Sequence, residues 1–164
     1  PNQVHPLMVG DEVPALTLVD INGDTFDLGA HKKPTVLVFY RGYWGPHCRR
    51  QLGQLQGLKE QLDNLGFEII AIAPDPPAKL AETRYGIGLT FLQLSDGDFA
   101  AAKAFGLAFL HKGKRPLPVP AIFVVAPNRK IQFQYINPDY RVRVDNDVLI
   151  TMVKAVARDF EIGR

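Results

Sequence analysis

The residue best suited to nucleophilic chemistry is Cys48, the only cysteine among the 164 residues of the chain. The thiolate form of cysteine attacks peroxides, disulfides and other electrophiles. Because no second cysteine is present, the chain cannot form an internal disulfide. A reaction that oxidises Cys48 must therefore be completed by a separate thiol or by a partner protein.

The residues before Cys48, Trp44-Gly45-Pro46-His47, are typical of the start of a helix. Proline at the first helical position loses no hydrogen bond, and it disfavours the helical conformation of the preceding residue. Cys48 is then predicted in the first helical turn, where unpaired N–H groups and the helix dipole favour negative charge. A free thiol ionises near pH ~8.5, and such a position lowers that value. These residues alone leave two interpretations open, a reactive thiolate and a buried small apolar side chain.

The elements that position Cys48 follow from hydrophobic periodicity. The continuous apolar run 34–40 predicts a strand buried on both faces, and the run 67–73 predicts a second one. Between them, leucines recur at helical spacing up to a cap at Gly66; these are Leu52, Leu55, Leu58, Leu62 and Leu65. Strand, helix and strand of these lengths predict a parallel pair with a right-handed crossover.

The rest of the chain predicts further strands and helices around this unit. Residues 13–18 and 25–28 predict an N-terminal β-hairpin, 121–125 and 131–135 predict another, and 91–94 predict a short strand. Helices are predicted at 78–85, ended by Gly86, and after an N-cap at Asp145. The last helix is expected to bury Val148, Leu149, Met152, Val153, Val156 and Phe160. We expect one α/β domain over residues 1–164.

Composition narrows the function classes. The chain is 46% hydrophobic and 22% charged with a net charge of +2, which is typical of a globular protein without a membrane segment. The basic cluster 111–115 lacks interleaved aromatic residues and is interpreted as a solvated loop, so no nucleic-acid partner is expected. The four histidines show no metal-ligand spacing, and neither a metal nor a cofactor is expected. Without an internal disulfide or a visible secretory signal, a cytoplasmic location is expected.

The segment 38–52, Val-Phe-Tyr-Arg-Gly-Tyr-Trp-Gly-Pro-His-Cys-Arg-Arg-Gln-Leu, resembles the active-site segment of the alkyl hydroperoxide reductase/thiol-specific antioxidant (AhpC/TSA, peroxiredoxin-like) family. Residues 9–14, 72–75 and 117–121 are similar to other family segments, so the likeness covers about residues 8–160. It implies a thioredoxin-like fold, with a central mixed β-sheet flanked by helices and an N-terminal β-hairpin extension.

The resemblance also implies a function. It predicts a thiol-dependent antioxidant oxidoreductase in which Cys48 reduces hydrogen peroxide or alkyl hydroperoxides. An external thiol, such as glutathione or a thioredoxin-like protein, would regenerate the cysteine. A homodimer is left open.

The chain departs from the family pattern at three places. Paired-cysteine members carry a cysteine where Gly45 stands, and peroxiredoxins read Pro-x-x-x-Thr-x-x-Cys, where this chain has Arg41 and Gly45. Peroxiredoxins also carry an arginine just before their late strand, where this chain has Pro120. Because the threonine and this arginine are both missing, the first expectation is a one-cysteine peroxidase that is slow. Two alternatives stay open: a monothiol disulfide or glutathione oxidoreductase, and a redox-inactive thioredoxin-fold binding module.

Further site residues follow from the resemblance. Arg41 is the first candidate to stabilise the thiolate, followed by Arg141 or Arg143 in the segment before the last helix. Pro120, which follows Val119, resembles the cis-proline that thioredoxin-fold enzymes place beside their active-site cysteine. Trp44, Gly45, Pro46 and His47 are expected to surround the site, with His47 contributing to the local field rather than acting as a base.

Overall fold

The computed structural model describes residues 4–43, 46–111, 115–136 and 144–162. Its main element is a seven-stranded mixed sheet of order β2-β1-β5-β4-β3-β8-β9. The strands are β1 (Thr17–Asp20), β2 (Thr25–Asp27), β3 (Thr35–Phe39), β4 (Glu68–Ala73), β5 (Leu92–Ser95), β8 (Ala121–Val125) and β9 (Ile131–Ile136). A separate hairpin pairs β6 (Ala108–His111) with β7 (Arg115–Pro118).

The centre of the sheet consists of the strands predicted to be buried. β3 pairs in parallel with β4, which pairs in parallel with β5, while β8 lies antiparallel to β3 on its other side. All five residues of β3 and all five of β8 are buried, because helices or loops cover both faces of the sheet there. The parallel β3–α1–β4 unit that the sequence predicted is thus confirmed, with α1 at Pro46–Asn64.

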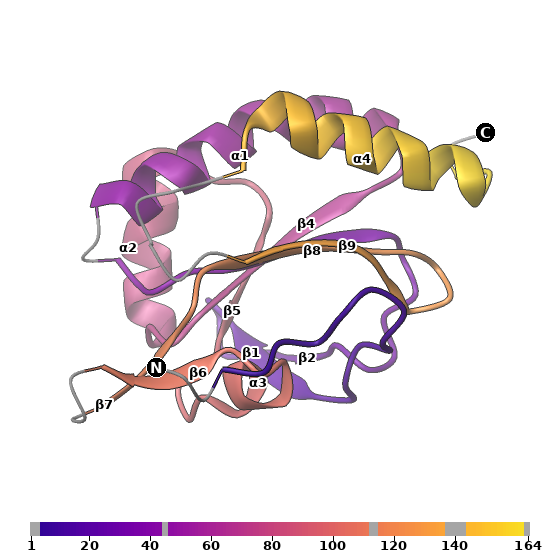
Figure 1. The fold of residues 1–164 in the computed structure, drawn as a ribbon. Coiled ribbons are helices and arrows are strands. Elements are labelled where there is room, and N and C mark those ends of the chain that lie inside the picture. Colours follow the sequence, from indigo (N-terminus) through magenta and orange to yellow (C-terminus); the bar gives the residue numbers. More distant parts are fainter. Residues whose placement is uncertain (1–3, 44–45, 112–114, 137–143, 163–164) are drawn as a thin grey trace.

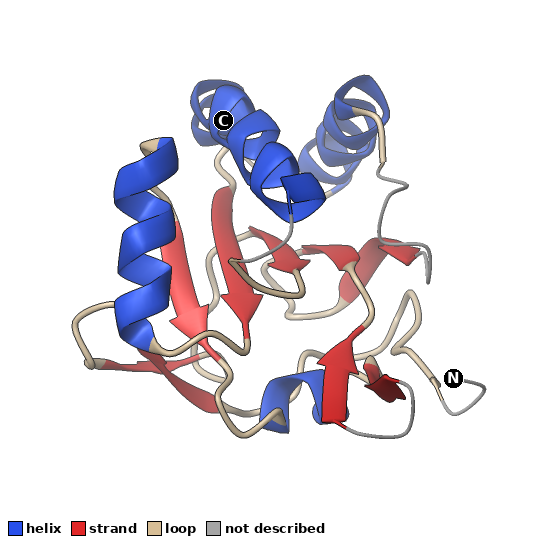
Figure 2. Ribbon diagram, turned by 90° about the vertical axis from the view of Figure 1, so that its left-hand side faces the viewer, coloured by secondary structure: helices blue, strands red, loops and turns tan. Residues whose placement is uncertain are grey.

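Helices form layers on the two faces of this sheet (Figure 1). Helix α1, α2 (Pro77–Ile87) and α4 (Asn146–Asp159) lie on one face, and the short α3 (Ala100–Ala104) lies on the other with β6 and β7. The rotated view shows the strands between the long helices and the short one (Figure 2). None of the helices in the described ranges has the length and apolar character that crossing a bilayer requires.

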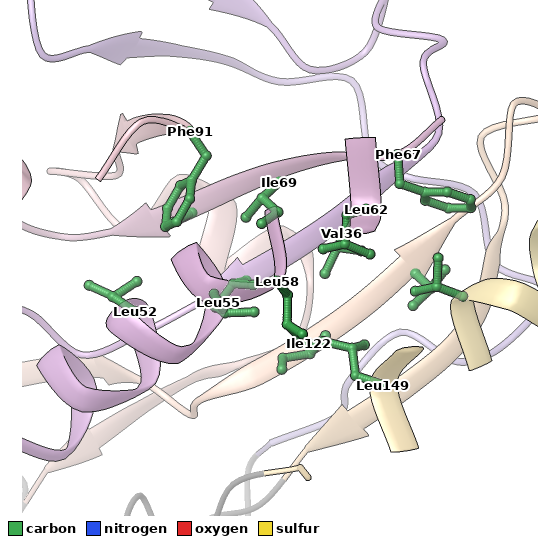
Figure 3. Close-up of a cluster of buried hydrophobic side chains, with 14 of the residues drawn as sticks. Val36, Leu52, Leu55, Leu58, Leu62, Phe67, Ile69, Phe91, Ile122 and Leu149 are labelled. Atoms are coloured by element: carbon green, nitrogen blue, oxygen red, sulfur yellow. The ribbon is translucent and has the colours of Figure 1, made fainter. Parts of the chain in front are cut away.

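Two hydrophobic clusters fill the spaces between the layers. On the α1 side, leucines of the helix pack on alternate residues of the central strands and on Leu149 of α4 (Figure 3). The strand residues in this cluster include Val36, Val38, Ile69 and Ala71. Their sequence neighbours, including Leu37 and Ile70, belong to the cluster on the opposite face. Because side chains alternate between the two faces, the α1-facing residues of a strand also indicate the face of a residue that extends it.

Helix ends show one confirmed cap and one corrected boundary. The Asp145 carboxylate accepts a hydrogen bond from the Asp147 amide at 2.8 Å, so the predicted N-cap of α4 is confirmed. The predicted end of α2 at Gly86 is wrong, because the helix continues to Ile87. Gly88 then adopts the left-handed conformation with φ 85° and ends it. Glycine inside a helix weakens the helix without terminating it.

The structure corrects two other predictions and adds a hairpin. The first strand of the N-terminal hairpin begins at Thr17 rather than at residue 13. The buried face of α4 includes Ile150, whereas Val148 is 47% exposed. The hairpin of β6 and β7, which the sequence did not predict, includes the first and last residues of the basic cluster, while residues 112–114, on which the loop interpretation falls, lie outside the described residues. The expectation of one domain over residues 1–164 stays a prediction.

Candidate active site

Cys48 is positioned by the connection from β3 to α1. β3 ends at Phe39, and the backbone then passes through Gly42, whose φ of 148° favours glycine. α1 begins at Pro46, as the sequence predicted, so Cys48 is the third residue of the helix and lies in its first turn. No acidic side chain is present in that turn, and Arg49 and Arg50 are exposed beside it. The local field of the helix end is therefore positive.

The Cys48 side chain is buried, with 1% of its surface exposed. It belongs to the hydrophobic cluster on the α1 face, together with Val38, Tyr40 and Leu52. The sequence left two interpretations open, and the structure has a feature of each. Cys48 is buried, as a small apolar side chain would be, and it lies at the start of a helix, as a reactive thiolate would. Any reactant must reach the sulfur through a small opening or after a local movement.

Tyr40 is a polar side chain in the same cluster as Cys48. It follows β3 and continues the alternation of Val36 and Val38, so its ring faces α1. The residue has no exposed surface, and its hydroxyl has no hydrogen-bond partner of standard geometry. Burial raises the pKa of Tyr40, and the nearby Asp75 and Cys48 raise it further. The hydroxyl is therefore neutral and buried on the α1 face of the sheet.

Asp75 is an acidic group at the same edge of the sheet. It lies two residues after β4, in the bend that leads to α2. Its residue surface is 6% exposed, and one carboxylate oxygen, Oδ2, has no hydrogen-bond partner. Burial raises the pKa of Asp75 to about 6, although a hydrogen bond from the Tyr43 backbone amide and the charge of Lys79 act in the opposite direction.

Side chains of β5 complete the polar surroundings of Tyr40 and Asp75. Gln93 is buried and donates to the Leu80 carbonyl at 3.0 Å, while its own carbonyl oxygen accepts from Arg84 at 3.3 Å. Gln93 lies near the Tyr40 hydroxyl and opposes the rise of the Tyr40 pKa. The Ser95 hydroxyl donates to the Asp75 backbone carbonyl at 2.7 Å. These bonds fix the backbone of Asp75 and leave its carboxylate oxygen Oδ2 available.

Arg41, the first candidate to stabilise the thiolate, contacts a side chain on the opposite face of the sheet. Arg41 is 8% exposed, and its guanidinium carbon lies 5.4 Å from the centroid of the Phe109 ring in β6. Phe109 packs on the cluster of the opposite face, so this contact is directed away from the α1 layer. A role of Arg41 at the thiolate stays a prediction.

Pro120 is buried and directly precedes β8. The register of β3 and β8 pairs Phe39 with Ala121, and its continuation places Pro120 beside Tyr40. No described peptide bond is cis, so the likeness of Pro120 to the family's cis-proline does not extend to its peptide bond. The location near the cysteine-bearing edge nevertheless agrees with the resemblance.

The remaining predicted site residues fall into two groups. Pro46 is exposed and His47 is half-buried at the start of α1. Trp44, Gly45, Arg141 and Arg143 lie outside the described residues. Within the described ranges, no group of three or more His, Cys, Asp or Glu side chains could hold a metal ion.

Comparison with known proteins places this geometry in a family. The sequence model of the AhpC/TSA family matches residues 9–134. The chain belongs to the AhpC/TSA family. The matched region includes Cys48, Tyr40 and Asp75, so the buried edge described above lies within the family's shared part.

Individual relatives are peroxiredoxins by name. The chain is 36% identical over 105 residues to a putative peroxiredoxin bcp from Haemophilus influenzae, which covers 63% of this chain and 68% of that protein. It is 28% identical to peroxiredoxin Bcp from Escherichia coli, over 92% of this chain and 98% of that protein.

Solved structures show the same fold. Peroxidoxin BcpB from Mycobacterium tuberculosis superposes with a TM-score of 0.80 at 22% identity, covering 92% of this chain and 98% of that one. A peroxiredoxin-like protein from Aquifex aeolicus gives 0.83 at 16% identity, covering 93% and 89%. The expected thioredoxin-like fold, a mixed sheet flanked by helices, is thereby confirmed.

Sequence reasoning did not identify Tyr40 and Asp75 as site residues. Both follow apolar strands and occupy the carboxyl edge of parallel strands, the edge where α/β proteins bind ligands. Combining that rule with the two-residue alternation of β3 would have placed the Tyr40 side chain on the cysteine face. The sequence therefore contained the pattern that places these residues, but using it required the parallel pairing of β3 with β4 to be known.

Proposed function

We propose that this chain is a thiol peroxidase in which Cys48 reduces hydrogen peroxide or alkyl hydroperoxides. The sulfur attacks the terminal peroxide oxygen, the O–O bond breaks, and the products are a cysteine sulfenic acid and water or an alcohol. The enzyme class follows from membership of the AhpC/TSA family and from relatives named peroxiredoxin.

One observation carries the assignment to Cys48. It is the only thiol of the chain, and it lies in the first turn of α1 within the family-matched region. Backbone N–H groups at a helix start have no intrahelical partners, and they favour a thiolate. Arg49 and Arg50, exposed in the same turn, add positive charge to this end of the helix.

Burial of the sulfur influences which peroxides react. Hydrogen peroxide is close to water in size, whereas an alkyl hydroperoxide requires a wider opening. Because Cys48 is only 1% exposed, we expect hydrogen peroxide to react faster than bulky alkyl hydroperoxides. Local opening of the α1 start would reduce this preference.

Regeneration of Cys48 requires an external thiol. A sulfenic acid condenses with a thiol to form a mixed disulfide, and a second thiol then releases the cysteine. Glutathione or a thioredoxin-like protein supplies these thiols in a reducing compartment such as the cytoplasm. A homodimer is compatible with this chemistry but is not required by it.

Turnover measurements test the proposed function. Peroxide consumption is followed with the wild-type protein and Cys48→Ser, once with glutathione and its reductase and once with a thioredoxin system. We expect catalytic consumption with at least one reductant and none above background for the serine variant. Equal rates for the two proteins would contradict the assignment.

A redox-inactive binding module is the second candidate, because burial of Cys48 is also what an inert cysteine would show. In that case an extended polypeptide would bind beside Pro120, and binding would survive Cys48→Ser. Peptide binding to both proteins without any oxidation of Cys48 would favour this candidate over the peroxidase.

A further inference from the structure

Two exposed arginines lie beside the buried thiol, and neither has an ionic partner. Arg49 and Arg50 directly follow Cys48 in the first turn of α1, and both are exposed. Among the described residues, neither guanidinium group forms an ion pair, whereas Lys59 of the same helix is paired with Asp63 at 2.8 Å. The two charges next to the nucleophile are therefore available to a molecule from solution.

The sequence around Cys48 keeps carboxylates away from these charges. No acidic residue occurs from residue 28 to residue 59, a range that includes the β3–α1 connection and most of α1. The nearest acidic groups of the neighbouring β4–α2 segment are already engaged or covered. Glu82 is ion-paired with Lys79 at 2.9 Å, and Asp75 is buried. The exposed charge in the turn that carries Cys48 is therefore positive.

Helix α2 positions one of the two guanidinium groups. A Cβ atom on Gly86 of α2 would lie 3.2 Å from Arg49 Nη2, so the guanidinium group packs against the glycine. The Arg49 side chain thus lies over the junction of α1 and α2 instead of extending freely into solvent. Because its freedom is already reduced, it loses less side-chain entropy when it binds a ligand.

The chemistry of a single cysteine brings a second molecule to this place. Under the proposed peroxidase function, Cys48 becomes a sulfenic acid, and an external thiol must attack its sulfur. Because Cys48 is only 1% exposed, a small thiol needs a narrower opening to reach the sulfur than a thiol on a folded protein does. Carboxylates of such a thiol would stay at the surface, where the arginines are exposed. Arginine binds a carboxylate through two parallel N–H···O bonds.

We propose that Arg49 and Arg50 select a small thiol that carries carboxylates as the molecule that regenerates Cys48. This inference rests on the proposed peroxidase function and names the class of its reductant. Glutathione belongs to this class, because it has one carboxylate on each side of its cysteine.

Regeneration balances in two steps. The thiolate RS⁻ attacks the sulfur of Cys48–SOH, the S–S bond forms, the S–O bond breaks, and the leaving hydroxide takes the proton of the attacking thiol to become water. A second RS⁻ attacks the R sulfur of the mixed disulfide and releases RSSR. The Cys48 thiolate then takes the proton of the second thiol. Two thiols have thus reduced the sulfenic acid, and the carboxylates of R serve only to bind.

The first experiment compares thiols that differ only in charge. Cys48 is oxidised with one equivalent of hydrogen peroxide, and the loss of the sulfenic acid is followed with 3-mercaptopropionate and with its uncharged amide. Rates are expressed per thiolate, because the two thiols ionise to different extents. A unit charge about 8 Å away in water changes the rate of an anion about twofold. For two arginines we expect the carboxylate thiol to react about four- to sixfold faster than the amide.

Substitution of the arginines tests whether they cause this preference. Arg49→Gln and Arg50→Gln each remove one positive charge and keep a long polar side chain. Arg158→Gln is the matched control, because Arg158 is exposed in the last turn of α4, at the far end of the helical layer from the start of α1 (Figure 1). We expect each of the first two changes to lower the rate ratio about twofold and the control to leave it unchanged. Salt at about 1 M should remove most of the wild-type preference by screening.

Alkylation provides a readout that does not depend on peroxide. Iodoacetate and iodoacetamide attack the same thiolate and differ in charge, so the ratio of their rates is independent of the Cys48 pKa. This matters because loss of an arginine also changes that pKa. We expect the ratio of iodoacetate to iodoacetamide to be higher for the wild type than for free N-acetylcysteinamide, and to fall in the double variant Arg49→Gln/Arg50→Gln.

The outcomes distinguish this inference from the proposed function. If hydrogen peroxide does not oxidise wild-type Cys48, the proposed function fails and the inference fails with it. If Cys48 is oxidised but 3-mercaptopropionate and its amide react equally fast, the inference alone is refuted. A preference that the double variant retains in full also refutes it, because the helix end alone then attracts the anion. Faster regeneration by reduced thioredoxin than by glutathione, at equal thiol concentration, would overturn the choice of a small thiol.

Discussion

Ionisation of Asp75 should destabilise the folded protein, and this is testable independently of catalysis. Burial raises the pKa of this carboxyl from its usual 3.8 to about 6. One pKa unit corresponds to about 1.4 kcal/mol, so ionised Asp75 lowers the free energy of unfolding by about 3 kcal/mol. Little solvent screening applies, because the residue is 6% exposed.

The sign of this effect fixes its pH window. The folded state binds the Asp75 proton more tightly than the unfolded state does. The stabilising contribution of the protonated form is therefore complete below pH 3.8 and is lost as the pH rises through about 6. About half of the ~3 kcal/mol is expected to be lost between pH 5 and pH 8.

Asp75→Asn removes this pH dependence. Urea unfolding of the wild type and the variant at pH 5, 6.5 and 8 measures the difference in the free energy of unfolding. We expect the variant to become increasingly more stable than the wild type as the pH rises. A stability difference that is constant across these pH values would refute the described environment of Asp75.

Three further predictions concern single side chains. If Arg41 stabilises the thiolate, Arg41→Met will shift the midpoint of Cys48 alkylation to higher pH, whereas the contact with Phe109 alone predicts no shift. Leu55→Ala should lower the free energy of unfolding by about 2–5 kcal/mol in urea titrations, because Leu55 is 1% exposed in the core. Asp145→Ala should lower it by about 1 kcal/mol through loss of the α4 N-cap, and a change below ~0.3 kcal/mol would contradict the cap.

The central part of the fold could be predicted because its periodicity is strong. Continuous apolar runs, the leucine spacing of α1 and Pro46 at the helix start all indicate the same β–α–β unit, which the structure contains. The sequence indicated the ends of the helices and strands less clearly than their centres. Gly86 and Gly88 are both able to end a helix, and only the conformation of Gly88 decides between them.

Other features depend on contacts that a sequence does not display. β7 contains two prolines, which argue against a strand, yet its pairing with β6 forms outside the main sheet, where such residues are tolerated. Val148 and Ile150 are equally apolar, so the face of α4 that is buried follows from its packing on the sheet. Tyr40 and Asp75 become neighbours only once β3 and β4 pair in register.

Trapping the oxidised sulfur tests the central claim most directly. The protein is treated with one equivalent of hydrogen peroxide in the presence of dimedone, and the peptide containing Cys48 is examined by mass spectrometry. The peroxidase assignment predicts a dimedone adduct on Cys48 in most molecules within minutes. An unmodified Cys48 under these conditions would contradict it.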